Sequence, residues 1–335
     1  MKYFYLALVF PVVLFASCNG KKDTKKQLTL PDDPTLEQLD KLVQQNPDND
    51  KILYERAKYL YENDDYEKAI ADLKKAIKID SLNPAYYHLL ADAYLDNAQP
   101  NHAINTLQEI LNIYPERIPS LLKLSEFYFI LKEYDKAISV LNGILYLSPN
   151  NPEAYFMLGQ VFREQGKLIK AKNSFLTAVE NNPEHIDAWL ALGQVAEQLN
   201  DTLAPVYYDN ILKIDSLNIP ALHHLAFYYQ NHNDLNKALE IYKKIGIINP
   251  DYTSAFLNSG IIYLYMDSLK AAFENFNIVT NIDKANPKGY YYRALTYYYN
   301  QDYDKAKKDL ETALKLNPDY EKAKKLKEKI EKVES

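Results

Sequence analysis

The sequence predicts an all-α solenoid built from repeated helical hairpins. Small residues recur at a fixed interval, turn-forming Asn and Pro residues separate most intervals, and only eight glycines occur among 335 residues. So little glycine is not typical of turn-dense β architectures, whereas the abundant Ala, Leu, Lys and Glu are strong helix formers. An apolar content of 47% and a charged content of 25% are typical of a folded protein.

Alanine marks the interval. It recurs at Ala69, Ala103, Ala137, Ala171, Ala204, Ala238, Ala272 and Ala306. The steps between these alanines are equal, except that the step from Ala171 to Ala204 is one residue shorter. A second small residue precedes each alanine by twelve positions, or by eleven in the fifth interval, at Ala57, Ala91, Ser125, Gly159, Gly193, Ala226, Gly260 and Ala294. Close packing of two helices requires small side chains where they cross. We therefore expect the three glycines of this set to serve helix packing rather than phosphate binding.

A large apolar residue lies four positions before each second small residue, and the fifth interval reads W-L-A-L-G from Trp189 to Gly193. This pattern resembles the tetratricopeptide repeat, a helix–turn–helix unit of about 34 residues. The resemblance covers residues 50–320 and implies eight repeats that form a right-handed superhelical solenoid. We expect an N-terminal half-repeat at 35–49 and a charged capping helix at 321–335, because the last repeat of a solenoid has no neighbour to cover it.

Residues 1–17 have the layout of a signal peptide, in which Lys2 precedes an apolar run too short to span a membrane. Its end, L-F-A-S-C, resembles the lipobox of bacterial lipoproteins, which implies that Cys18 carries lipid. Cys18 is the only cysteine, so it forms no internal disulfide. Residues 18–34 are polar and are expected to form a flexible tether.

The lipobox implies a lipid-anchored protein of the bacterial cell envelope. In some bacteria an aspartate directly after the cysteine marks retention in the inner membrane. Here that position is Asn19, so the retention signal is missing. We therefore expect the protein on the outer membrane, facing the periplasm.

The resemblance implies that positions 2, 5, 9, 12 and 13 of each repeat line a concave groove. In repeats six to eight these positions are mainly apolar, and the candidate partner-binding residues are His223, Phe227, Leu257, Ile261, Leu264, Tyr265, Tyr291, Leu295, Tyr298 and Tyr299. In repeats two to five they carry carboxylates, at Asp92, Asp96, Glu126, Glu153, Glu164, Asp187 and Glu197. We expect a peptide or helix of another envelope protein in the groove. Alternatively, the C-terminal groove is covered by the chain's own end helix or by a second copy in a homodimer.

Composition and missing motifs exclude several functions. A formal net charge of −6 does not suit a general nucleic-acid binder, which needs clustered Lys and Arg. The chain has no G-x-G-x-x-G, Walker, H-E-x-x-H or C-x-x-C motif, so we expect no enzyme, no cofactor and no metal site. The function expected is a non-catalytic, membrane-anchored protein–protein interaction scaffold. Two alternatives are an assembly factor for a pilus, secretion or outer-membrane complex, and an adaptor that docks peptidoglycan enzymes.

Overall fold

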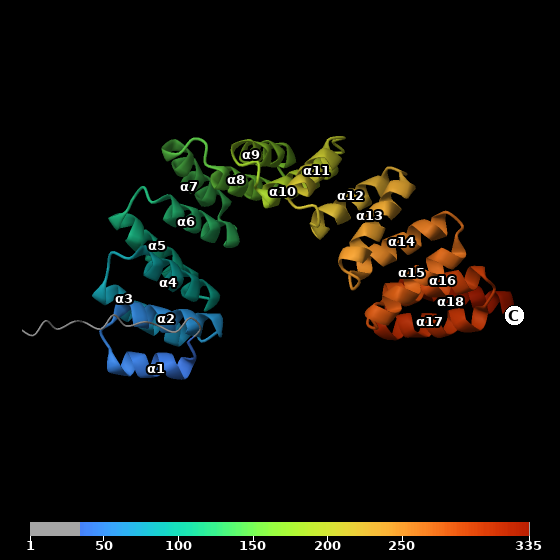
Figure 1. The fold of residues 1–335 in the computed structure, drawn as a ribbon, viewed down its shortest axis with the longest axis horizontal. Coiled ribbons are helices and arrows are strands. Elements are labelled where there is room, and N and C mark those ends of the chain that lie inside the picture. Colours follow the sequence, from blue (N-terminus) through green and yellow to red (C-terminus); the bar gives the residue numbers. More distant parts are fainter. Residues whose placement is uncertain (1–33, 335) are drawn as a thin grey trace, which may run out of the picture.

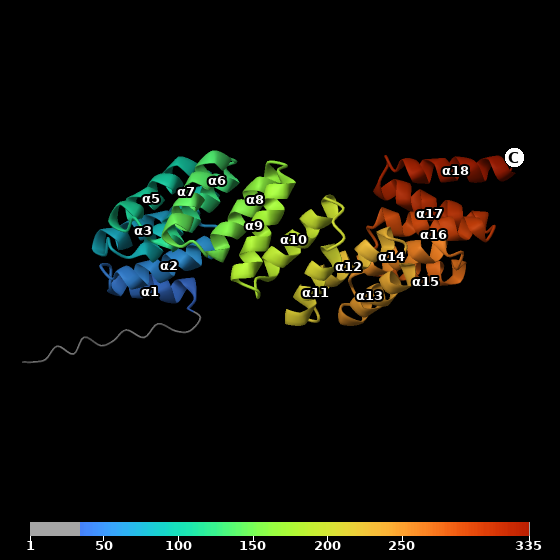
Figure 2. The same ribbon diagram turned by 90° about the horizontal axis from the view of Figure 1, so that it is seen from above.

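The computed structural model describes residues 34–334, which form eighteen α-helices and, within that range, no strand. The helices build an all-α superhelical solenoid that curves into an arch (Figure 1). Seen from above, the hairpins advance from α1 at one end of the long axis to α18 at the other (Figure 2). The expected signal peptide (1–17), Cys18 and the tether up to residue 33 lie outside the described residues.

Each repeat consists of two antiparallel helices joined by a short turn. The first helices are α2 (Asp50–Glu62), α4 (Pro84–Asp96), α6 (Ile118–Ile130), α8 (Pro152–Glu164), α10 (Ile186–Gln198), α12 (Ile219–Asn231), α14 (Thr253–Tyr265) and α16 (Pro287–Tyr299). The second helices are α3 (Tyr66–Ile79), α5 (Pro100–Ile113), α7 (Tyr134–Leu147), α9 (Leu168–Asn181), α11 (Ala204–Ile214), α13 (Leu235–Ile248), α15 (Leu269–Ile282) and α17 (Tyr303–Leu316). One further helix precedes the repeats and one follows them, α1 (Leu36–Gln45) and α18 (Glu321–Glu334).

A residue in the left-handed region closes the first helix of every repeat. These residues are Asp64, Ala98, Lys132, Gly166, Asn200, Asn233, Asp267 and Gln301. In the first repeat the N–H of Asp65 then donates to the carbonyl of Leu60 across 2.9 Å, and the other repeats make the equivalent bond. This bond pattern satisfies carbonyl groups that the end of a helix leaves unpaired. The chain therefore reverses within a few residues, and the two helices of a repeat lie side by side.

The small residues of the first helices allow aromatic rings of the second helices to pack against the backbone. A Cβ atom added to Gly159 would lie 2.4 Å from the ring of Phe175, and one added to Gly260 would lie 2.5 Å from Phe276. The same relation joins Gly193 to Tyr208, whose ring would be 2.4 Å away. These contacts confirm that the three glycines serve helix packing. The eight recurring alanines are fully buried, as their spacing predicts.

The fifth repeat is the irregular one. Its second helix begins at Ala204 itself, whereas in the other repeats it begins three residues before the recurring alanine. Leu203 stands at the N-cap without a side-chain hydrogen bond, and Pro205 occupies the first turn, where a missing N–H is tolerated. The side chain of Lys172 in the fourth repeat donates to Asp201 in the shortened turn. The one shortened alanine interval thus corresponds to a helix that lacks its first turn.

In the central repeats the first helices lie on the inner side of the arch. Figure 1 shows this for α6, α8 and α10, with α7, α9 and α11 on the outer side. The largest cluster of buried residues in the described chain runs from Val43 to Val161, and the buried residues beyond Ala171 form smaller clusters. In these repeats the inner, concave side of the arch is therefore formed by the first helices.

Candidate functional site: the concave groove

A cavity of about 560 Å³ opens on the concave face between α4, α6 and α8, and we call it the central pocket. It is lined by His88, Pro119, Leu122, Lys123, Glu126, Phe129, Glu153, Phe156, Met157 and Gln160. Leu122, Phe129, Phe156 and Met157 are half-buried, so apolar surface remains available in the cavity. Pockets of this size with mainly apolar walls and a few polar groups are typical of binding sites.

The charges at the N-terminal side of the central pocket are unequal. Lys123 Nζ lies 2.7 Å from Asp92 Oδ1, so this cation is already paired. Burial raises the pKa of the Asp92 carboxyl, and the nearby carboxylates of Glu126 and Asp96 raise that pKa further, against the lowering effect of Lys123. The side chain of Glu126 is exposed. Negative charge is therefore in excess beside the apolar cavity.

The C-terminal side of the central pocket is held by the residue before α10. His185 Nδ1 accepts the N–H of Ala188 at 3.4 Å, which leaves the ring proton on Nε2. Nε2 lies 3.4 Å from an Oε atom of Glu153, and the His185 ring lies 4.8 Å from that of Phe156. Nε2 is nevertheless buried without a hydrogen-bond partner, and the Glu153 side chain stays half-exposed at the rim.

The predicted acidic residues differ in their hydrogen-bond partners. Asp96 accepts the hydroxyl of Tyr61 at 2.6 Å, and Glu197 accepts the hydroxyl of Tyr208 at the same distance. These two carboxylates therefore already have hydrogen-bond donors within the solenoid. The exposed carboxylates of the set are Asp96, Glu126, Glu153, Glu164 and Asp187.

The predicted apolar groove of repeats six and seven is partly exposed. Phe227 is 39% exposed and Tyr265 is 75% exposed, whereas Leu257, Ile261 and Leu264 are half-buried. These positions offer apolar surface, but they do not line the central pocket.

His223 takes part in internal packing. Its ring stands between those of Tyr242 and Tyr252, with centroid distances of 5.9 and 5.6 Å. Burial lowers the pKa of His223, and the neighbouring His224 lowers it further. His223 is therefore better described as part of an aromatic cluster than as a free groove side chain.

In the eighth repeat the chain's own end helix covers much of the predicted groove. Tyr291, Leu295 and Tyr298 pack in a cluster with Ala323, Leu326 and Ile330 of α18. The Tyr291 ring lies 5.0 Å from that of Tyr320, and Lys329 Nζ lies 5.0 Å from the Tyr298 ring. Of the four candidate partner-binding residues in this repeat, only Tyr299 is exposed, at 55%. This arrangement is the alternative in which the end helix fills the groove.

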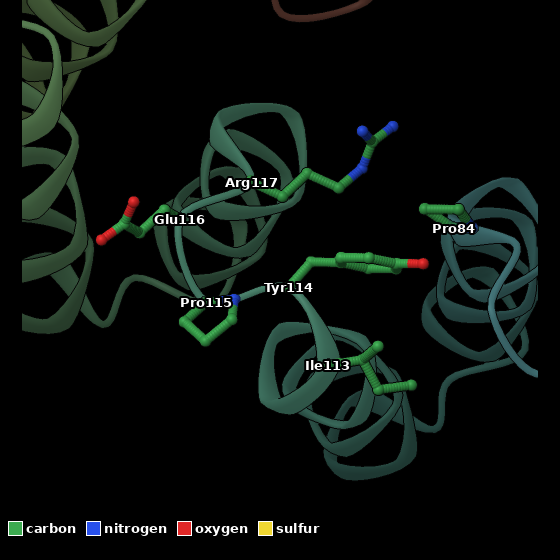
Figure 3. Close-up of a pocket in the computed structure, with 6 residues that line it drawn as sticks. All are labelled: Pro84, Ile113, Tyr114, Pro115, Glu116 and Arg117. Atoms are coloured by element: carbon green, nitrogen blue, oxygen red, sulfur yellow. The ribbon is translucent and has the colours of Figure 1, made fainter.

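A larger cavity, of about 710 Å³, lies at the edge of the solenoid between repeats two and three. Figure 3 shows that it is formed by the turn from α5 to α6 and by the start of α4, with the Tyr114 ring and the Arg117 side chain both directed toward Pro84. The Tyr114 hydroxyl donates to the carbonyl of Leu82 at 3.2 Å. Its walls are turn residues and helix ends, so it is separate from the concave groove.

Reading the groove positions for charge alone missed the apolar part of the central pocket. Phe129 occupies position 12 of its repeat, and Lys123 and Met157 occupy position 6, which was outside the five positions considered. The middle of the groove is therefore not simply acidic: carboxylates border apolar side chains, and one lysine pairs with Asp92. Including position 6 and the apolar residues of repeats three and four would have found it.

Two features are absent from the part of the chain that the structure describes. Between residues 34 and 334, no three His, Cys, Asp or Glu side chains are grouped so that they could hold a metal ion. No helix of that part is long and apolar enough to cross a bilayer.

Models of the tetratricopeptide repeat match residues 60–125, 118–151, 156–204 and 287–326. Together these segments cover more than half of the chain. The chain belongs to the tetratricopeptide repeat family. Proteins of this family mediate protein–protein interactions, and none of the four matching models describes an enzyme.

Similar proteins span several functions. The peroxisomal targeting signal receptor of Saccharomyces cerevisiae is 29% identical over 180 residues, which cover 50% of this chain and 29% of the receptor. The BBSome complex member BBS4 of Bos taurus is 28% identical over 192 residues, which cover 57% of this chain and 37% of BBS4. Among solved structures, the APC/C hetero-tetramer Cut9-Hcn1 is 18% identical with a TM-score of 0.50, covering 88% of this chain and 58% of that chain. This tetratricopeptide repeat protein matches less than two fifths of the length of the targeting signal receptor and of BBS4. The likenesses therefore show its fold and not the roles of those proteins.

Proposed function

We propose that this tetratricopeptide repeat protein is a non-catalytic, membrane-anchored scaffold that binds a peptide segment or helix of another envelope protein in its concave groove. The observation that carries the proposal is the central pocket. It combines half-buried apolar side chains with exposed carboxylates on the concave face, between three consecutive first helices. Solenoids use this extended inner face as a binding surface.

The exposed aromatic side chains of repeats six and seven support the same function. Phe227 and Tyr265 occupy groove positions and remain 39% and 75% exposed. Exposed aromatic side chains are favourable anchors in protein interfaces, where a few residues carry most of the binding energy. Burial of their apolar surface contributes about 25 cal/mol per Å² removed from water.

Lipid on Cys18 would keep the scaffold at the membrane. The support for this part is the L-F-A-S-C sequence at the end of the apolar leader. We expect the wild-type protein to incorporate labelled palmitate and to enter the detergent phase, and Cys18→Ser to do neither. Equal partition of the two proteins would contradict the anchor without affecting the groove.

Binding in the groove is tested by affinity capture from crosslinked envelopes. The wild-type protein is compared with a Leu122→Ser variant in the central pocket and with a Phe227→Ser/Tyr265→Ser variant in the C-terminal groove. A Tyr146→Ser variant is the control, because Tyr146 is 88% exposed on a second helix. We expect a partner that is captured by the wild type and by the control but lost from at least one groove variant. Equal capture by all four proteins would contradict a groove-binding scaffold.

A further inference from the structure

We propose that the central pocket binds an extended peptide segment in which one apolar side chain is flanked by lysine or arginine. This inference rests on the proposed function and specifies the chemistry of the partner. The geometry that supports it is the position of two exposed carboxylates, from the adjacent helices α6 and α8, in the lining of one apolar cavity.

The cavity accounts for the apolar side chain of the partner. Leu122, Phe129, Phe156 and Met157 contribute apolar walls from α6 and α8, and they remain half-buried. The volume of about 560 Å³ exceeds what a single aliphatic or aromatic side chain fills. Inserting such a side chain would remove apolar surface of both molecules from water, which is the main favourable contribution to association.

The charges at the rim account for the lysine or arginine. Glu126 from α6 and Glu153 from α8 are exposed carboxylates that line the cavity. The lysine of the pocket, Lys123, is paired with Asp92. Arg163, further along α8, donates to Gln194 across 3.4 Å and is followed directly by Glu164. The carboxylates therefore outnumber the cations, so a basic segment is attracted and an acidic one is repelled.

Gln160 favours an extended segment over a helix. Its Oε1 atom is buried against the pocket and has no hydrogen-bond partner. A buried acceptor without a partner is unfavourable, and rotation of the side chain toward an N–H donor in the pocket would satisfy it. A helix uses nearly all its backbone N–H groups internally, whereas an extended segment presents free ones.

The C-terminal groove lacks this combination. Tyr265 and Phe227 are exposed there, but the groove positions of repeats six to eight carry no carboxylate and a single cation, Lys288. A wholly apolar partner is not expected to bind the central pocket in preference to the C-terminal groove. A partner with both basic and apolar residues is expected to bind the central pocket in preference, because excess negative charge lies beside its apolar cavity.

The proposal is tested by selection from a library of random peptides, about twelve residues long so that an extended peptide can cross the three helices. The full-length chain in detergent is compared with a Glu126→Lys/Glu153→Lys variant and with the Tyr146→Ser control. We expect the wild type and the control to select peptides with lysine or arginine on both sides of an apolar residue. The charge-reversed variant should lose that preference. Selection of acidic or uncharged peptides by the wild type, or of no peptide at all, would overturn the proposal.

Affinity and conformation of a selected peptide provide the second measurement. Fluorescence anisotropy should show that Glu126→Gln and Glu153→Gln each weaken binding about two- to fivefold, which is the range for exposed charge pairs. Raising the salt from about 0.05 M to about 0.5 M should weaken it further. Affinity independent of both the substitutions and the salt would exclude charge recognition. A helical circular-dichroism signal in the bound peptide would exclude the extended segment.

The two proposals fail in different ways. If capture of a partner is lost in Phe227→Ser/Tyr265→Ser but unaffected by charge reversal at Glu126 and Glu153, the protein is a groove-binding scaffold whose partner lies elsewhere. If none of these variants, Leu122→Ser included, alters what is captured, both proposals fail. The four side chains substituted in the two double variants are exposed, so we expect these variants to stay folded. Circular dichroism of each variant checks that loss of binding is not caused by unfolding.

Discussion

The two halves of the groove differ in what contacts their apolar side chains. In repeats two to four, Phe129 and Met157 line an open cavity, and exposed carboxylates stand beside it. In repeat eight, Tyr291 and Tyr298 pack against α18, which lies where the first helix of a ninth repeat would lie. Position 12 of the repeat, held by Phe129 and by Tyr298, therefore borders an open cavity in one half and makes an internal contact in the other.

This difference shows that a residue's position in the repeat determines which way its side chain points, but not whether that side chain is exposed. The eighth repeat uses its tyrosines to join the end helix to the solenoid, as a terminal repeat without a neighbour requires. The central repeats have neighbours on both sides, so their remaining apolar groove surface is not needed to close the fold. Apolar residues in the central groove are accordingly the stronger indication of a partner.

The largest effect is expected at an ion pair that distinguishes the last repeat from the central ones. Arg293 donates to both carboxylate oxygens of the buried Asp309, at 2.7 and 2.8 Å, and also to Asn277 and Thr280 of the preceding repeat. Arg293→Ala would leave the Asp309 carboxylate buried without its partner. We expect it to lower the free energy of unfolding by about 3–5 kcal/mol, measured by urea denaturation.

The control for that prediction replaces both partners. Repeats two to six carry a buried leucine at the position of Arg293, for example Leu158 and Leu192. Arg293→Leu combined with Asp309→Leu should therefore be much less destabilising than Arg293→Ala, because no buried charge remains. Equal losses for the two variants would show that the ion pair itself stabilises the last repeat.

A second effect is expected where α18 covers the eighth repeat. Ile330 is fully buried in the cluster that contains Tyr291 and Tyr298. Ile330→Ala should cost about 2–5 kcal/mol in unfolding free energy, as is usual for truncation of a buried isoleucine. The matched control in the same helix is Val333→Ala, which should change little because Val333 is exposed. Equal small effects would mean that the end helix does not hold the groove closed.

A third effect concerns the helix packing beneath the central pocket. Phe175 lies 5.8 Å from the pocket residue Phe156 and packs on Gly159. Gly159→Ala should lower the unfolding free energy by about 1–3 kcal/mol, because the new methyl group would overlap the Phe175 ring. In an exposed helix the same change would instead stabilise by about 1 kcal/mol.

The compensating substitution makes this prediction specific. The first, second and eighth repeats carry alanine at the position of Gly159 and leucine at the position of Phe175, as in Ala57 and Leu73. Adding Phe175→Leu to Gly159→Ala should therefore restore much of the lost stability, measured as the midpoint of thermal unfolding. A double variant less stable than Gly159→Ala alone would contradict the overlap.

The smallest effect is a pH dependence at the central pocket. Burial lowers the pKa of His88 to about 4, with Lys123 and Arg117 adding to the effect, and its Nε2 lies 2.8 Å from Ser120 Oγ. The folded state thus favours neutral His88, so this contribution to stability is complete above pH ~6.5 and is lost as the pH falls toward 4. Allowing for solvent screening, we expect a loss of about 1–2 kcal/mol between pH 7 and 5. His88→Gln should remove that part of the pH dependence, and an unchanged profile would contradict it.

Most of the fold follows from the sequence because the repeat imposes the same requirement eight times. Small residues such as Gly193 are needed where an aromatic ring of the second helix meets the backbone of the first, because a larger side chain would overlap the ring. The one shortened interval, between Ala171 and Ala204, also marks the fifth repeat as the irregular one. Local spacing is sufficient to predict such features.

The candidate site was less predictable because it depends on contacts between repeats. Nothing in the spacing indicates that Lys123 pairs with Asp92 in the preceding repeat, or that Tyr208 donates to Glu197. Nor does it indicate that α18 covers Tyr298. These contacts depend on side-chain lengths and on the curvature of the stack, and they decide which groove residues stay available to a partner.

The most direct test of the central claim is photocrosslinking in intact envelopes. A photoreactive amino acid replaces Phe129 in the central pocket, Tyr265 in the C-terminal groove or Tyr146 on a second helix, one position at a time. The account predicts a crosslinked partner from position 129, competed by a basic–apolar peptide, and none from position 146. Crosslinks from position 146 but none from position 129 would contradict the claim that the concave groove of the central repeats is the binding surface.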